Sequence, residues 1–178
     1  MDCLTNSGIH NLCDKSSGGL INIWITSYNN LTDKDLLEYD ADGVLTAITS
    51  AFSATTEFFH YDTEKETAYA NEEPTFEGID GSTGYDVQLY MKFKKIDASK
   101  RNEMKFLTSS KTIAIVEDRV GNYRILGIDG GLTASSIRSQ SGAAIGESNG
   151  YEVTLNDQAV DLVPNLESKS VFSALLAA

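Results

Sequence analysis

The most constraining feature of the sequence is a strict alternation of apolar and polar residues at 85–95, YDVQLYMKFKK. The apolar side chains of Val87, Leu89, Met91 and Phe93 recur at every second position. Because neighbouring side chains of a β-strand point to opposite faces, this spacing predicts a strand with one face in the core and the other in solvent. The chain is therefore expected to be built on sheets.

Further stretches alternate in the same way or are rich in β-branched and aromatic residues, which favours strands. They are GLINIWITSY (19–28), GVLTAI (43–48), TTEFFHY (55–61), KTIAIVED (111–118), NYRILGID (122–129) and YEVTL (151–155). In the first stretch Ile21, Ile23 and Ile25 share one face, which we assign to the core. The glycine turn at 120–122 predicts a hairpin between the fourth and fifth stretches.

One segment changes period. In DASKRNEMKFLTSS (97–110), Arg101, Met104 and Leu107 recur at every third residue, and Asp97 is placed to cap a helix. This predicts a helix of about three turns. The expected fold class is mainly β with one helix, an α+β fold.

At 178 residues the chain is long enough for one full-sized domain, and we expect residues 1–178 to form a single domain with extensions. The extensions are an N-terminal arm at 1–18, extended segments at 62–84 and 130–148, and a C-terminal extension at 160–178. The polar segment 62–84 is expected to form a long loop or a protruding hairpin. The glycine-rich segment 130–148 has too few apolar side chains to hold a conformation by itself. The C-terminal extension ends in a short apolar tail that would be exposed unless something covers it.

The charge balance excludes some classes of partner. Acidic residues outnumber basic ones by 26 to 14, giving a formal charge of −12, and such a chain repels a phosphate backbone. Apolar runs such as LINIWI are far too short to span a membrane, and MDCLTNSG lacks the pattern of a signal peptide. We expect synthesis inside the cell, no membrane partner, and reduced thiols at Cys3 and Cys13.

The glycines of SGAAIGESNGYEVTL (141–155) lead into a strand instead of a helix, so this stretch does not predict a phosphate-binding loop. Glu38, Asp40, Asp42 and Gly43 imitate the first half of a calcium loop that starts at Glu38. Thr49 occupies the twelfth position, where a bidentate carboxylate is needed. An acidic turn is the favoured interpretation, with calcium as the alternative. His60 lies on the strand expected at 55–61 and shares a face with Phe58, so a packing or interface role is expected. We therefore predict no catalytic residue, no metal site and no cofactor, and we do not expect an enzyme.

The extensions instead favour self-assembly. Segments that are loose in one molecule gain order when neighbouring copies cover them, because contacts over a large surface offset the loss of entropy. The side chains expected to make these contacts are Glu64, Tyr69, Phe76, Leu132, Ile137, Arg138, Ile145, Phe172 and Leu175.

A series of stretches carries a resemblance over nearly the whole chain: CLTNSGI, GGLINIWI, DADGVLTAI, FFHYDTEKETA, KFLTSSKTIAIVEDRVGNYRILGIDGGL and SGAAIGESNGYEVTLN. Together they resemble the structural proteins of tailed-bacteriophage virions, namely tail tube or closely related tail and connector subunits. The resemblance implies a β-sandwich or barrel-like core with a flanking helix. It also implies hexameric rings whose inner strands form a continuous β-barrel lumen.

The resemblance further implies that the rings stack into a tail tube that conducts DNA without binding it specifically. The expected partners are the chain itself and other tail or connector proteins, in a virion assembled in the host bacterial cytoplasm. The net negative charge would keep DNA from adhering to the tube, although ordinary solubility accounts for that charge equally well.

Other functions stay open at this point. A head–tail connector or a capsid decoration protein would share the same β-rich ring. A stand-alone β-sandwich binding module would use Trp24 and tyrosines as stacking platforms. The tyrosines are scattered along the sequence and form no visible patch, which counts against the binding module.

Overall fold

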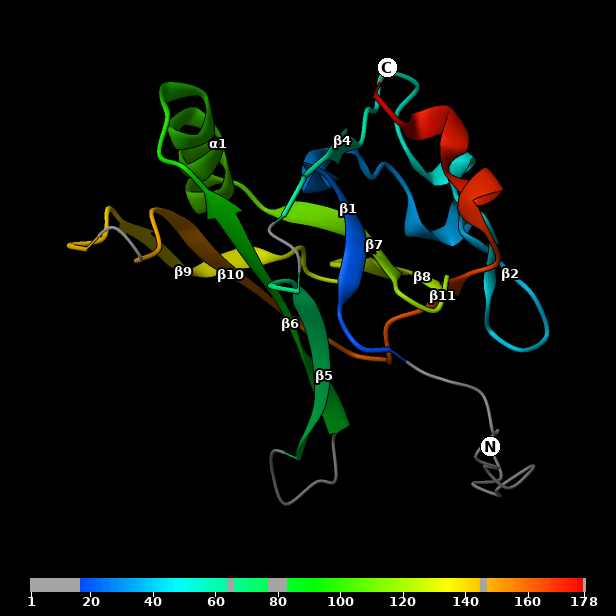
Figure 1. The fold of residues 1–178 in the computed structure, drawn as a ribbon. Helices are drawn as coiled ribbons and strands as arrows, with labels where there is room; N and C mark the ends of the chain where they lie inside the picture. The colour runs from blue at the N-terminus through cyan, green and yellow to red at the C-terminus, as the bar shows by residue number, and fades with distance from the viewer. Residues whose placement is uncertain (1–16, 64–65, 77–82, 145–146, 178) are drawn as a thin grey trace.

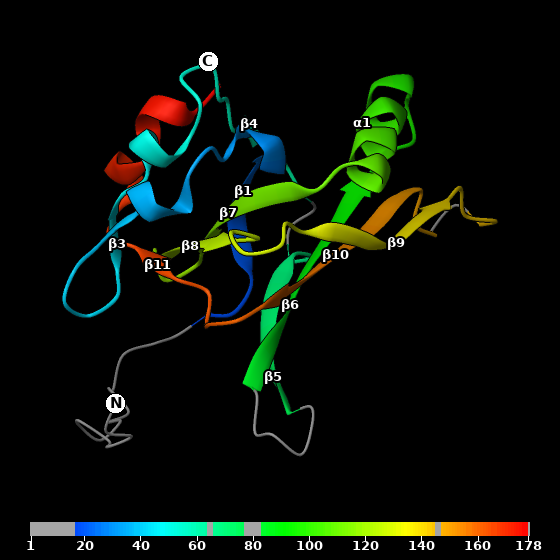
Figure 2. The same cartoon turned by 180° about the vertical axis from the view of Figure 1, so that it is seen from behind.

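The structure is a computed structural model of the chain and describes residues 17–63, 66–76, 83–144 and 147–177. Two β-sheets pack against each other, and a layer of short helices and loops covers the other face of the larger sheet (Figures 1 and 2). The expected class, mainly β with one helix, is confirmed. No helix among the described residues has the length and apolarity needed to cross a bilayer.

The large sheet has seven strands, of which only the central ones are long. In spatial order they are β2 (Glu38–Tyr39), β3 (Leu45–Ala47), β11 (Asn165–Leu166), β8 (Tyr123–Leu126), β7 (Thr112–Asp118), β1 (Leu20–Ser27) and β4 (Phe59–His60). The predicted hairpin is confirmed: β7 and β8 pair antiparallel, with Ala114 opposite Leu126. The carboxylate of Asp118 accepts hydrogen bonds from the N–H groups of Val120 and Asn122 and so fixes the turn.

The four-stranded sheet is antiparallel throughout. Its strands are, in spatial order, β5 (Tyr69–Phe76), β6 (Thr83–Lys94), β10 (Gly150–Ala159) and β9 (Thr133–Gln140). The alternation predicted at 85–95 is confirmed, since Val87, Leu89, Met91 and Phe93 are all buried. This face of the sheet packs against the large sheet.

The predicted helix is confirmed as α1 (Ala98–Ser109). The side chain of Asp97 caps it by accepting a hydrogen bond from the Lys100 N–H at 2.8 Å, and this bond lowers the Asp97 pKa. Met104 and Leu107 are buried against the sheets. The other helices are single 3-10 turns: η1 (Tyr28–Asn30), η2 (Lys34–Leu36), η3 (Thr49–Ala51), η4 (Lys169–Val171) and η5 (Ser173–Leu175).

The central strands β1 and β7 are buried on both faces, so the molecule has two cores. The inner core lies between the two sheets, where Ile23 and Ile25 of β1 meet the apolar face of the four-stranded sheet. The outer core lies between the large sheet and the layer of short helices, and Trp24 of β1 is part of it. The prediction that Ile21 shares the core face was wrong. A bulge shifts the pairing between Leu20 and Asn22 and leaves the Ile21 side chain 53% exposed.

The C-terminal tail is not exposed, which corrects the expectation from sequence. Phe172 is fully buried in the outer core, with its ring centroid 5.4 Å from that of Trp24. The Phe58 N–H donates to the Leu175 carbonyl at 2.7 Å, and Leu175 is buried too. The apolar side chains of this tail therefore complete the subunit's own core, although Val160 and Leu162 earlier in the extension remain exposed.

The segment 130–148 was expected to lack structure of its own, and this was wrong for its first half. Leu132 is fully buried and exchanges two backbone hydrogen bonds with Thr112, at 2.8 and 2.9 Å. Strand β9 follows and pairs with β10. The pairing supplies the backbone partners that the composition of the segment could not reveal.

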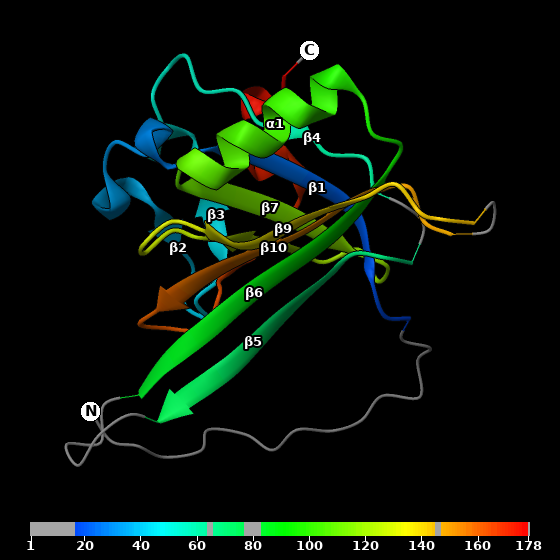
Figure 3. The same cartoon turned by 90° about the vertical axis from the view of Figure 1, so that its left-hand side faces the viewer.

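The segment 62–84 adopts the second of its two expected forms. Strands β5 and β6 make a hairpin that extends beyond the body of the molecule (Figure 3). Of the N-terminal arm at 1–18, residues 1–16 lie outside the described residues.

The burial of the tail makes a testable prediction. Phe172→Ala should lower the free energy of unfolding by about 3–5 kcal/mol, because it leaves a cavity beside Trp24. Urea unfolding at equilibrium measures the change. Ala174→Ser, at an exposed position in the same tail, is the matched control and should change stability by less than about 0.5 kcal/mol. A loss below about 1 kcal/mol for Phe172→Ala would show that the tail is not part of the core.

Candidate assembly surface and acidic cavity

The four-stranded sheet ends in long strands that no other strand of the described chain covers. Its edge strands, β5 and β9, have eight residues each, whereas the edge strands of the large sheet, β2 and β4, have two residues each. A long uncovered edge offers a row of backbone donors and acceptors to another chain, and natural proteins often blunt edges by keeping them short. Association by strand pairing is therefore favoured at the four-stranded sheet.

Each of these edges has one point that limits pairing. Pro74 in β5 has no N–H to donate. In β9 the pairing register shifts so that Ser135 is an extra residue between partners, which is a bulge. The regular stretches of edge are therefore Tyr69–Glu73 in β5 and Ser136–Gln140 in β9.

The outer face of the four-stranded sheet, opposite the inner core, is polar and arranged in rows across the strands. From Asp86 to the end away from the hairpin, the rows are Glu73-Asp86-Gln158, Asn71-Gln88-Asn156-Thr133, Tyr69-Tyr90-Thr154-Ser136, Lys92-Glu152-Arg138 and Lys94-Gly150-Gln140. Acidic groups occupy the first row, and basic groups predominate in the last two. Lys92 and Glu152 form an ion pair at 3.2 Å. The net negative charge of the chain is therefore not concentrated on this face.

Two tyrosines that looked scattered in the sequence meet on this face. Register places Tyr69 opposite Tyr90, and their rings stack with centroids 5.0 Å apart and planes 17° apart. Burial raises the pKa of Tyr90, and the nearby Glu152 carboxylate raises it further. The Tyr69 side chain is 42% exposed, so the pair forms a small aromatic platform open to solvent.

The structure separates the side chains predicted to contact other copies. Tyr69 and Arg138 lie on the outer face of the four-stranded sheet, at its two edges. The prediction was wrong for Leu132, Phe172 and Leu175, which are buried within the subunit, and Ile137 packs against the inner core. The backbone of Phe76 ends β5 opposite Thr83. Glu64 and Ile145 lie outside the described residues.

Sequence reasoning missed the row of amide side chains on the outer face, Asn71, Gln88 and Asn156. Its signal was present at 85–95, where Gln88 alternates with buried residues, but the partners on β5 and β10 could be aligned only with the register known. Two residues expected to have packing or turn roles, His60 and Asp40, have hydrogen-bond partners in the structure. His60 Nε2 makes a hydrogen bond with the Asn22 side chain at 3.0 Å, and the Asp40 carboxylate accepts the N–H groups of Asp42 and Val44.

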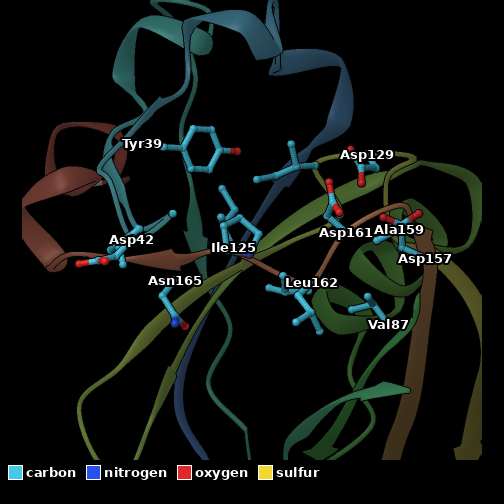
Figure 4. Close-up of a pocket in the computed structure, with 16 residues that line it drawn as sticks. Tyr39, Asp42, Val87, Ile125, Asp129, Asp157, Ala159, Asp161, Leu162 and Asn165 are labelled. Carbon is cyan, nitrogen blue, oxygen red and sulfur yellow. The ribbon is translucent and has the colours of Figure 1, made fainter. Parts of the chain in front are cut away.

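A second feature is a cavity of about 550 Å³ at the end of β10, drawn in Figure 4. The turn between β2 and β3, the loop after β8 and the segment 161–165 enclose it. Four carboxylates line it: Asp42, Asp129, Asp157 and Asp161. Apolar side chains form much of the remaining wall.

Asp157 is the most buried of these carboxylates, with its side chain only 7% exposed. Burial raises its pKa, the backbone N–H groups of Gly130 and Gln158 act in the opposite direction, and the Asp129 charge raises it again. Its Oδ2 atom has no hydrogen-bond partner among the described residues. A Cβ on Gly130 would lie 2.6 Å from Oδ1, so a larger residue at that position would require the Asp157 side chain to shift.

The negative charges of the other carboxylates are balanced to different degrees by nearby cations, hydrogen-bond donors and solvent. Lys34 Nζ lies 3.2 Å from Asp129 Oδ1, and the Val160 N–H donates to the other oxygen. Asp161 is exposed at the rim. On the opposite wall, the hydroxyl of Tyr39 points toward the side that holds Asp129 and Asp161 (Figure 4). Burial and the Asp129 charge raise the Tyr39 pKa.

Comparison of the chain with protein-family models, with curated proteins and with solved structures found no match.

The raised pKa of Asp157 predicts a pH dependence of stability. The folded chain holds the Asp157 proton more tightly than the unfolded chain, whose carboxyl titrates near the ordinary value of 3.8. The stability contributed by this proton is fully present below that value and is lost as the pH rises through the raised value. Relative to Asp157→Asn, the wild-type chain should therefore lose free energy of unfolding as the pH rises above 3.8.

Urea unfolding at a series of pH values measures this difference. Asp86→Asn removes a carboxylate from the outer face of the same sheet and controls for the change in net charge. A wild-type chain that gains stability relative to Asp157→Asn as the pH rises would contradict the assignment.

Proposed function

We propose that this chain is a structural subunit of a bacteriophage tail, which assembles into rings that stack to form the tail tube and conduct DNA. The observation that carries the proposal is the pair of long edges on one sheet with which no described strand pairs, beside the short edges of the other. Because β5 and β9 are different surfaces, copies would join head to tail. Such contacts build either a closed ring or an open filament.

The directions of the strands are compatible with closure. Successive strands of the four-stranded sheet are antiparallel, so β9 of one copy would meet β5 of the next in antiparallel orientation. Full pairing of Tyr69–Glu73 with Ser136–Gln140 puts Asn71 opposite Arg138. Both side chains are then on the outer face, as the pleat requires.

This register also supports a barrel. Within one subunit Tyr69 shares a row with Ser136, whereas across the proposed contact it would meet Gln140, a shift of four residues over four strands. With about 3.3 Å per residue and about 4.8 Å between strands, the strands tilt by about 35°. Closed barrels have tilts of about 35–45°.

The outer face would line the lumen in this arrangement, because the opposite face is buried in the inner core. Two of its rows hold only hydroxyl and amide groups and tyrosine rings. Lys92, Lys94 and Arg138 lie in the two rows at one end, where Lys92 pairs with Glu152. DNA adheres where several cations contact successive phosphates. The cations are thus confined to one end of the wall and form no continuous track along it, which suits a conduit for DNA.

The remaining parts of the proposal follow from the resemblance to tail proteins. It implies hexameric rings, other tail or connector proteins as partners, and a place in the virion after assembly in the host cytoplasm. The β5–β6 hairpin, which extends beyond the body, is the element best placed to reach an adjacent ring (Figure 3). A head–tail connector or capsid decoration protein would use the same edges. Locating the subunit in intact virions distinguishes the tail, the connector and the capsid surface.

A cross-linking experiment tests the edge pairing. Asn71→Cys and Arg138→Cys are combined in a chain whose own Cys3 and Cys13 are replaced by Ser. Facing residues of paired antiparallel strands approach closely enough for a disulfide, so mild oxidation should give a ladder of covalent oligomers that ends at the ring size.

Two controls sharpen this test. Each single Cys variant should stop at dimers, and Asn71→Cys with Thr133→Cys should give no ladder, because Thr133 lies beyond the bulge. The proposal fails if the Asn71 and Arg138 pair gives no ladder at any protein concentration, or if the displaced pair gives the same ladder.

The stacked tyrosines favour a second candidate, a stand-alone binding module for a carbohydrate. Tyr69 and Tyr90 present an aromatic platform beside Thr154 and Asn71, and sugars stack on such platforms. Glycan-array binding by the wild-type chain that is lost in Tyr69→Ala would support this function. Absence of binding by the wild-type chain would reject it.

A further inference from the structure

The acidic cavity at the end of β10 has features of a binding site that are separate from the sheet edges. Asp157 is more than nine-tenths buried, lies in the cavity wall, and has an oxygen with no hydrogen-bond partner among the described residues. Buried polar atoms in native proteins are almost always paired, and an unpaired one calls for an explanation. Asp157 Oδ2 is covered in the structure, so a donor that enters the cavity supplies the missing partner when the side chains around Asp157 move aside.

The arrangement of the carboxylates argues against a metal ion as the missing partner of Asp157. Among the described residues, no three Asp, Glu, His or Cys side chains converge closely enough to hold a metal. Calcium takes six to eight oxygen ligands, and a cluster without even three convergent side chains does not provide them. The carboxylates are instead spread around a cavity of about 550 Å³, which is the size of a small-molecule site.

The rest of the wall matches a cation with an apolar body. Val87, Ile125 and Leu162 line the cavity together with the ring of Tyr39 (Figure 4). Alkyl chains of basic groups pack along apolar surface, and cations are attracted to the face of a tyrosine ring. Lys34 pairs with Asp129, and the Lys111 charge acts on Asp157. Two cations therefore face four carboxylates, and the cavity keeps a negative balance.

We propose that this cavity binds a primary ammonium or guanidinium group carried on an aliphatic chain, with Asp157 as its buried counter-ion and Asp161 at the rim. The N–H groups of the ligand donate to Asp157 Oδ2, and the chain packs on the apolar wall. Such a group is found on small organic cations and on the side chains of Lys and Arg. The site does not depend on the proposed strand pairing.

Isothermal titration calorimetry of the full chain with n-butylguanidinium tests this site. Binding should be saturable, and n-butylurea, which has nearly the same shape but no charge, should not bind. Asp157→Asn should weaken binding about tenfold or more, because the charged partner is lost. Asp86→Asn, on the outer face of the same sheet, is the matched control and should bind as the wild type does.

Asp161→Asn keeps the test decisive if Asp157→Asn does not fold. Asp161 is exposed, so its replacement should leave folding unchanged and should weaken binding by less than Asp157→Asn. The inference is overturned if the wild-type chain shows no saturable binding, or if n-butylurea binds equally well. Equal binding by folded Asp157→Asn would overturn it too.

Comparison of assembled and unassembled protein distinguishes the two sources of the cation. If a side chain of a neighbouring copy fills the cavity, the assembled protein should no longer bind n-butylguanidinium. If the ligand is a free small molecule, both forms should bind it. A chain that never associates yet binds n-butylguanidinium would reject the proposed function and leave this inference standing.

Discussion

The burial of β1 and β7 on both faces is the constraint on which the rest of the structure depends. A strand buried on both faces needs an apolar cover on each side, and this chain has enough apolar side chains for two thin cores only if distant segments contribute. The four-stranded sheet and α1 cover one face, and the C-terminal tail covers the other, with Phe172 against Trp24. Side chains that would otherwise be available to partners are thereby used within the subunit.

The sequence predicted the parts of the fold that depend on local pattern. The strand at 85–95, the helix capped by Asp97 and the hairpin over 111–129 are each decided by residues that are neighbours in the chain. The tail and β9 could not be predicted in this way, because what orders them is a partner far away in sequence, such as Phe58 for the tail and β10 for β9. The bulge that exposes Ile21 is also a property of a pair of strands, and one strand alone does not encode it.

The same reasoning explains which part of the candidate site was predicted. Apolar residues in polar segments were interpreted as contacts for other copies, but Leu132 and Phe172 mark the points where those segments attach to their own subunit. The argument for assembly from loose extensions therefore loses its basis at these segments. Its present basis is the backbone of two long edges, where the predicted residues Tyr69 and Arg138 do lie. Asp157 could not be found from sequence at all, because only the fold surrounds it with a cavity.

The central claim is that the four-stranded sheets of neighbouring copies join edge to edge. Cryo-electron microscopy of the concentrated full chain tests it most directly, since it shows both the symmetry and the strands at each contact. The account predicts closed rings in which β9 of one copy continues into β5 of the next, with the outer faces lining the lumen. A chain that stays monomeric at every concentration, or rings joined through other surfaces with β5 and β9 left uncovered, would contradict it.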